Sequence, residues 1–206
     1  MYSGIKNIVF DMGNVLIRFD PEYFLTREDV TDAQDRELLM QAVFRSDEWR
    51  MADQGLLDEA GLEKIALQKL PQRLHEIAHR LIFHWNEPLL PIEGMADFVR
   101  ECKQKGLGVY LLSNATVRQP SYWPDIPGSE YFDGAVISAC ERLSKPMPEI
   151  YRRLLARYDL AAKECLFVDD MQANVDGAIS VGMKGFLFTG DVRALRTSVF
   201  TQKGVF

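Results

Sequence analysis

The sequence predicts an α/β protein: a parallel sheet flanked by helices, with a small all-helical segment inserted after the first strand. Short apolar runs rich in β-branched residues recur along the chain, and from about residue 91 onward they alternate with segments of helical spacing. Between residues 18 and 90 there are helical faces and no convincing strand. With 206 residues and 47% hydrophobic composition, the chain can bury a full core with an insert.

The elements follow in chain order from these patterns. Strands are expected at residues 5–10, 109–112, 134–138, 165–168 and 185–188. Helices are expected where apolar residues recur three and four positions apart, at 38–43, 62–67, 74–82, 95–102, 150–155 and 175–181. We therefore expect a core made of residues 1–17 and 91–206 and a helical domain made of residues 18–90.

Composition limits the classes of partner. A formal net charge of −6 argues against a nucleic-acid partner, which requires clustered Lys and Arg. The chain has no apolar run approaching the ~20 residues of a membrane helix, and its start does not resemble a secretory signal. Three widely spaced cysteines, Cys102, Cys140 and Cys165, are typical of reduced thiols. We expect a cytoplasmic monomer or weak dimer that binds no nucleic acid and no membrane.

Polar side chains stand where three of the expected strands end, and a lysine lies between two of these strands. Ligands of open α/β sheets bind at the carboxyl edge of the strands, so we expect these side chains to meet there. The residues concerned are Asp11, Ser113, Asn114, Lys145, Asp169 and Asp170.

The carboxylates in this set fit phosphoryl transfer, in which most of the catalysis is positioning and charge stabilisation. Asp11 can attack phosphorus to form an aspartyl phosphate that water then hydrolyses. Asp11, Asp169 and Asp170 concentrate negative charge that a divalent cation would offset, and oxygen ligands of this kind select Mg²⁺. We expect Asp170 to bind the cation directly, and Asp169 either to bind it or to accept hydrogen bonds beside it.

The remaining residues of the set fit phosphate binding. The Ser113 hydroxyl and the Asn114 backbone N–H can donate to phosphate oxygens where a strand turns into a helix. Lys145 supplies the fixed positive charge that offsets developing negative charge. Each also has an ordinary interpretation, as a turn former or an exposed lysine, but their common order with the acidic residues favours function.

In order and rough spacing, these segments resemble the four motifs of the haloacid dehalogenase superfamily. Residues 10–15, 112–114, 122–124, 145–151 and 167–174 are similar to its bacterial α-D-glucose-1-phosphate phosphatase branch. The resemblance implies a Rossmann-like core, a small cap domain formed by residues 18–90, Mg²⁺ as cofactor and a small phosphorylated metabolite, such as a sugar 1-phosphate, as substrate. It also implies that the backbone carbonyl of Gly13 is a metal ligand.

Gly13 is also a departure from the superfamily pattern. Most phosphatases of the superfamily carry there a second Asp that acts as general acid and base, a role commonly worth ~10²–10⁴ in rate. Two explanations stay open: a residue of the helical segment such as Asp53 or Glu48 replaces it, or an anomeric sugar oxygen leaves without much help. The alternatives to a phosphatase are a catalytically weak phospho-ligand-binding protein and a metal-free 2-haloacid dehalogenase, which has no use for Asp169 and Asp170.

Two other groups of residues attract attention. His75, His79 and His84 occur at helical spacing, but apolar residues lie between them and no fourth ligand is evident, so a helix face explains them better than a metal site. Aromatic residues are most often core, and we expect only Trp49 and Trp123 at the rim of the site.

Overall fold

The five expected strands form one parallel sheet. In this computed structural model, which describes residues 4–200, the strands are β1 (Asn7–Phe10), β2 (Gly108–Ser113), β3 (Gly134–Ile137), β4 (Cys165–Asp169) and β5 (Lys184–Leu187). The order across the sheet is β3-β2-β1-β4-β5, and every neighbouring pair is parallel. The chain builds outward from β1 first to one side and then to the other, so the carboxyl ends of β1 and β4 mark the place where such sheets bind ligands.

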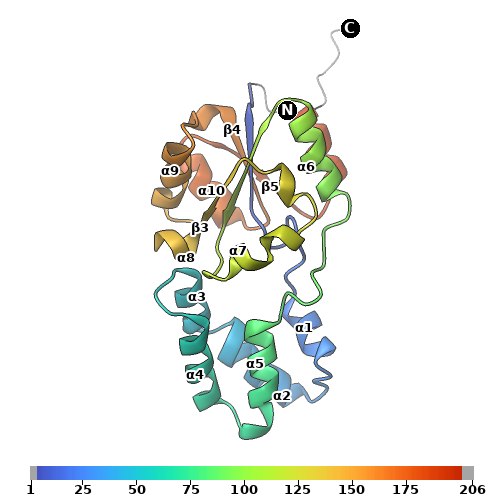
Figure 1. Cartoon of the computed structure of the whole chain (residues 1–206), viewed down its shortest axis with the longest axis vertical. Coiled ribbons are helices and arrows are strands. Elements are labelled where there is room, and N and C mark those ends of the chain that lie inside the picture. The colour runs from blue at the N-terminus through green and yellow to red at the C-terminus, as the bar shows by residue number, and fades with distance from the viewer. Residues whose placement is uncertain (1–3, 201–206) are drawn as a thin grey trace.

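Helices cover both faces of this sheet (Figure 1). The helices of the core are α6 (Met95–Gln104), α7 (Gln119–Tyr122), α8 (Ser138–Glu141), α9 (Pro148–Arg157), α10 (Gln172–Ser180) and α11 (Val192–Phe200), with short 3₁₀ turns at η3 (Trp123–Asp125), η4 (Ser129–Tyr131) and η5 (Ala162–Glu164). Helices α6 and α11 pack on one face, and α9 and α10 on the other. The fold is the Rossmann-like α/β architecture that the sequence predicted.

Alternation along the central strand produces these two cores. Ile8 and Phe10 point to the side of α6, where the rings of Phe10 and Phe98 meet edge to face with centroids 6.1 Å apart. Val9 points to the other side and packs with Tyr151 of α9. Because successive side chains of a strand face opposite ways, a strand covered on both faces is apolar throughout, which explains the unbroken apolar run before Asp11.

The segment between β1 and α6 is helical. It contains α1 (Pro21–Arg27), α2 (Ala33–Leu39), a π-helical turn η1 (Met40–Phe44), α3 (Asp47–Asp53), α4 (Glu59–Lys69), a 3₁₀ turn η2 (Gln72–Leu74) and α5 (His75–Phe83). We call residues Pro21–Phe83 the helical insert. It forms the lower part of the molecule in Figure 1, beyond α7. The division of the chain at residues 18 and 90 into separate domains stays a prediction.

Short polar residues start the first four helices of the insert. The side chains of Asp20, Asp32, Ser46 and Asp58 each accept a hydrogen bond from a backbone N–H in the first turn. Such caps satisfy N–H groups that have no partner within the helix and stabilise it by about 0.5–2 kcal/mol. Ser46 starts α3, the helix that carries Trp49 and Asp53.

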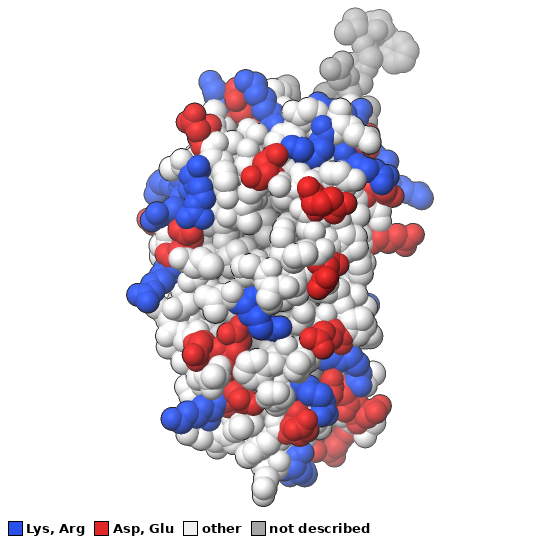
Figure 2. Space-filling model, in the orientation of Figure 1, with Lys and Arg blue, Asp and Glu red and all other residues white. Residues whose placement is uncertain are grey.

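Basic and acidic side chains are interspersed on the face shown in Figure 2. Within residues 4–200, no helix has the length and apolar character that crossing a membrane requires.

The three histidines have separate partners, the Leu70 carbonyl, Glu63 and Glu87, and do not form a common metal site.

Candidate active site

Three carboxylates meet at the carboxyl ends of β1 and β4. Asp11 directly follows β1, and its backbone N–H donates to the Val168 carbonyl, 2.9 Å away, which continues the pairing of the two strands. Asp169 is the last residue of β4, and Asp170 follows it. One carboxylate oxygen from each of these three residues lies within 4.8 Å of the other two, so the fold brings together acids that the sequence separates by almost 160 residues.

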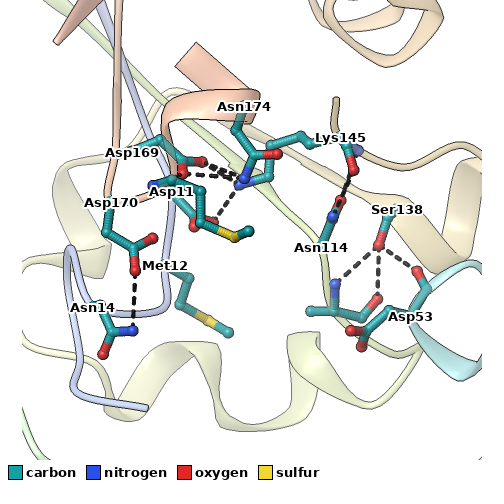
Figure 3. Close-up of polar contacts among 12 residues, drawn as sticks. Asp11, Met12, Asn14, Asp53, Asn114, Ser138, Lys145, Asp169, Asp170 and Asn174 are labelled. Carbon is teal, nitrogen blue, oxygen red and sulfur yellow. Dashed lines mark hydrogen bonds and ion pairs between the residues drawn. The ribbon is translucent and has the colours of Figure 1, made fainter. Parts of the chain in front are cut away.

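Lys145 lies against two of these acids (Figure 3). Its Nζ is 2.6 Å from Asp11 Oδ1 and 2.8 Å from Asp169 Oδ2, and its side chain is only 1% exposed. Burial alone would lower the pKa of Lys145, but the two carboxylates outweigh this effect and hold the pKa above its usual range. Lys145 is therefore charged in its buried ion pairs, and its role in offsetting phosphate charge stays a prediction.

Asn114 positions the backbone of Lys145. Its side-chain Nδ2 donates to the Lys145 carbonyl at 3.0 Å, and its Oδ1 accepts from the Lys145 N–H at 2.9 Å. The role of the Asn114 backbone N–H as a phosphate donor stays a prediction, and the structure shows that the Asn114 side chain binds the backbone of Lys145. Asn114 lines the cavity described below.

Ser113 ends β2 and is buried. Its hydroxyl has no hydrogen-bond partner in the part of the chain that the structure describes. A buried hydroxyl without a partner is costly, which is the condition expected of a group that waits for a ligand oxygen. Ser113 is not among the residues that line the cavity, so its contact with a phosphate oxygen stays a prediction.

Asp169 is held by several donors. Its Oδ1 accepts from the Met171 N–H at 2.8 Å, and the amide of Asn174 donates to both oxygens at 3.0 and 3.2 Å. With Lys145 on Oδ2, both oxygens are engaged, which favours the second of the two expected roles, that of an acceptor beside the cation. Asn174, the third residue of α10, thereby orients Asp169.

Asn14 is a residue that the sequence did not single out. Its Nδ2 donates to Asp170 Oδ2 at 3.1 Å, and its backbone adopts φ 54°, a left-handed conformation that asparagine tolerates better than most residues. The only local signal was an asparagine directly after Gly13. Its contact with Asp170 joins residues that are 156 positions apart, so the sequence alone does not predict it.

The electrostatics of the cluster suit a divalent cation. Burial raises the pKa of Asp11 to about 7, with Lys145 lowering it and the nearby Asp169 raising it further. Burial also raises the pKa of Asp170, against a hydrogen bond from Asn14. A single lysine does not compensate three clustered carboxylates, and an oxygen-only donor set fits Mg²⁺.

A cavity of about 200 Å³ opens above the cluster and separates the sheet from the helical insert. Its polar lining includes Asp11, Gly13, Asn114, Lys145 and Asp170 from the core and Asp53 from the insert. Its aromatic walls are Phe19, Trp49, Trp85 and Tyr122. The cavity can accept a phosphate at the strand ends and a compact organic group against the rings.

The aromatic predictions were partly wrong. Trp49 lines the cavity as expected, but Trp123 instead packs edge to face on Phe132, with ring centroids 5.0 Å apart. Trp85, which the sequence did not place at the site, lines the cavity and packs against Phe19 at 5.1 Å. The aromatic walls therefore come from the insert (Trp49), from the segments that join the insert to the core (Phe19 and Trp85) and from α7 (Tyr122).

Of the two candidate replacement acids, only Asp53 lines the cavity. Glu48 accepts two hydrogen bonds from Lys69 Nζ, at 2.9 and 2.8 Å, and the cavity lining does not include it. The structure thus separates two residues that the sequence could not distinguish.

Comparison with known proteins agrees with this geometry. A family model described as haloacid dehalogenase-like hydrolase matches residues 5–182. The chain is 29% identical over 195 residues to a sesquiterpene phosphatase of Aspergillus oryzae, covering 92% of each chain. It is 26% identical to a phosphorylated carbohydrates phosphatase of Thermotoga maritima, covering 87% of this chain and 83% of the relative.

Solved structures repeat the fold. A haloacid dehalogenase family enzyme from Bacteroides thetaiotaomicron, crystallised with magnesium and inorganic phosphate, superimposes with a TM-score of 0.72 at 23% identity. The match covers 93% of this chain and 99% of that one.

Proposed function

The chain belongs to the haloacid dehalogenase-like hydrolase family, and we propose that it is a magnesium-dependent phosphatase of small phosphorylated metabolites. The observation that carries this proposal is the meeting of Asp11, Asp169 and Asp170 with Lys145 at one strand edge, below a cavity of metabolite size. The relatives named as phosphatases support it.

Asp11 is the proposed nucleophile and carries the phosphoryl group between the two half-reactions. Its carboxylate attacks phosphorus, the bond from phosphorus to the leaving oxygen breaks, and water then hydrolyses the aspartyl phosphate. Lys145 stabilises the negative charge on the transferring group, and Ser113 and Asn114 donate to phosphate oxygens. Asp11, Asp170 and the Gly13 carbonyl would hold Mg²⁺, with Asp169 beside them, and the bound cation neutralises phosphate charge.

The proposed substrates are sugar phosphates, with sugar 1-phosphates first. Aromatic rings such as Trp49 and Trp85 offer flat apolar faces against which a sugar ring can pack, while Asp53 and Thr116 offer polar contacts in the same cavity. The carbohydrate phosphatase among the relatives supports this choice.

A second substrate class is favoured by a specific observation. Met12, Phe19, Trp85, Tyr122 and Met171 give the cavity a largely apolar wall, which would also suit the phosphate of an apolar alcohol. The sesquiterpene phosphatase relative supports this alternative.

The helical insert is the proposed cap of the site, with residues 18–90 as its bounds. Three unpaired cysteines support a reducing, cytoplasmic location, where we expect a monomer or weak dimer.

The experiment is a measurement of phosphate release from a panel containing a sugar 1-phosphate, a sugar 6-phosphate, a sesquiterpenyl phosphate and an aryl phosphate. We expect turnover with Mg²⁺ that chelation abolishes and that Asp11→Asn reduces at least ~10³-fold. Tight binding without release would favour the phospho-ligand-binding alternative. Halide release from 2-haloacids that survives chelation would favour the dehalogenase.

A further inference from the structure

The cavity contains few groups that could move a proton to a leaving group. Its titratable lining residues are Asp11, Asp53, Tyr122, Lys145 and Asp170. Asp11, Lys145 and Asp170 belong to the nucleophile and the cation site. Burial raises the pKa of Tyr122 far above neutrality, so its hydroxyl does not exchange its proton readily. Asp53 is the group without a task in the reaction as described so far.

Contacts between the insert and the core fix the backbone at Asp53. Its carbonyl accepts a hydrogen bond from the Ser138 hydroxyl, which in turn accepts from the Ala115 N–H at 2.9 Å (Figure 3). The next residue, Gln54, donates from Nε2 to Ser144 Oγ at 2.9 Å, directly beside Lys145. We call residues 53–55 and their partners at 138–144 the insert junction.

Gly55 completes the insert junction by close packing. A Cβ at this position would lie 2.1 Å from the Ala139 carbonyl oxygen, so the backbone of the insert rests directly on α8. A glycine with φ 68° fits where a larger residue would push the turn away. The junction therefore holds the insert against the core at the residue that presents its carboxylate to the cavity.

The surroundings of Asp53 suit a group that both gives and takes a proton. Its side chain is half-buried, and burial together with the nearby negative charges of Asp11 and Glu59 raises its pKa to about 7. Lys145 and a hydrogen bond from the Trp49 side chain act in the opposite direction. Tyr122 also lies near Asp53, and because burial raises its pKa it stays neutral at about pH 7.

We propose that Asp53 is the general acid and base of this phosphatase, supplied by the helical insert in place of the acid that Gly13 does not provide. This inference rests on the proposed function. As Asp11 attacks and the bond from phosphorus to the leaving oxygen breaks, the Asp53 carboxyl gives its proton to that oxygen, releasing the alcohol. The Asp53 carboxylate then takes a proton from the water whose oxygen attacks the aspartyl phosphate, releasing phosphate and restoring both aspartates.

The choice of leaving group isolates this role. An alkyl alkoxide needs a proton to leave, whereas a nitrophenolate leaves as a stable anion. The value of kcat/KM reports only the steps up to release of the alcohol, so it does not contain the later hydrolysis in which Asp53 acts as base. A positioned general acid is worth ~10²–10⁴ in rate, which sets the expected effect on the alkyl ester.

The test compares wild type, Asp53→Asn and the control Glu48→Gln on a sugar 6-phosphate and on p-nitrophenyl phosphate with saturating Mg²⁺. We expect Asp53→Asn to lower kcat/KM for the sugar ester ~10²-fold or more and for the aryl ester less than ~10-fold. Glu48→Gln, which changes a carboxylate of the same helix outside the cavity, should stay within ~2-fold on both. Retained aryl turnover shows that the variant is folded.

Equal losses on the two esters would overturn the proposal, since they indicate a structural role. If Asp53→Asn does not fold, the pH profile of the wild type decides: kcat/KM for the sugar ester should fall above about pH 7 while the aryl ester lacks this limb. Identical profiles would contradict the inference. Failure of the wild type on both esters would instead count against the proposed function.

Discussion

Replacing Asp53 by Asn should make the metal-free protein more stable at alkaline pH. The folded protein holds the proton of Asp53 up to about pH 7, whereas the ordinary pKa of the group is 3.8. Between these values the folded state binds more protons than the unfolded state, so the stability contributed by this group falls as the pH rises. This loss of folding stability is absent below about pH 4 and complete above about pH 7.

The magnitude follows from the same two values. A pKa raised from 3.8 to about 7 corresponds to at most about 4 kcal/mol at full ionisation. Solvent screens a side chain that is only half-buried, so we expect about 1–3 kcal/mol in practice. For a protein of this size, that range corresponds to a rise of about 2–10 °C in Tm.

The assay is urea unfolding of both proteins in chelator at pH 5, 6, 7 and 8. The free energy of unfolding of Asp53→Asn should exceed that of the wild type by an amount that grows with pH. Glu48→Gln is the control, and its effect on stability should have the opposite sign. Hydrogen bonds from Lys69 lower the pKa of Glu48, so loss of the Glu48 carboxylate should lower the free energy of unfolding by up to about 1 kcal/mol at neutral pH. A constant difference across the pH range, or a less stable Asp53→Asn at pH 8, would refute the reasoning.

Two further substitutions test the buried charges and the insert junction. Lys145→Met leaves Asp11 and Asp169 without their buried cation, and should cost about 3–5 kcal/mol in urea unfolding without metal, a cost that added Mg²⁺ should partly offset. Gly55→Ala should cost about 1–3 kcal/mol more than Gly106→Ala in thermal unfolding, because both have a left-handed backbone but only the first places a Cβ against a neighbouring carbonyl. An equal cost for the two glycine variants would contradict the close packing at the junction.

The sheet could be predicted from the sequence because its central strands β2, β1 and β4 are largely buried on both faces. Strands of this kind read as continuous apolar runs, and the five runs coincide with β1–β5 to within two residues at either end. The exception that matters is Ser138, expected as the end of a strand and found at the start of α8. Its hydroxyl binds groups 23 and 85 positions away, and local propensity carries no information on such contacts.

The site could be predicted only where a residue type and its place at a strand end both point to the same chemistry. Asp11, which follows β1, and Asp169 and Asp170, at the end of β4, satisfy this condition, whereas Lys145, in the loop before α9, was identified by its place in the order of the motifs. The positions of Trp85 and Trp123 could not be predicted in this way. A tryptophan on a turn can face a cavity or a neighbouring ring with a similar gain in buried area. Asp53 and Glu48 lie on the same helix, but Glu48 binds Lys69 and Asp53 lines the cavity. The sequence alone does not distinguish the two, because Lys69 is 21 positions away from Glu48.

If the general acid is on the insert, contact between the insert and the core controls whether a proton donor is present at the site. A carboxylate on the strand itself would stay beside the nucleophile whatever the position of the insert. In the structure, Asp53 lines the cavity while Gly55 rests on α8 and the Ser138 hydroxyl donates to the Asp53 carbonyl. If Asp53 is the general acid, a leaving group too large to allow these contacts would bind its phosphate at Lys145 without a proton donor. Selection among substrates can then act on the chemical step as well as on binding, since the wrong alcohol prevents assembly of the group that would release it.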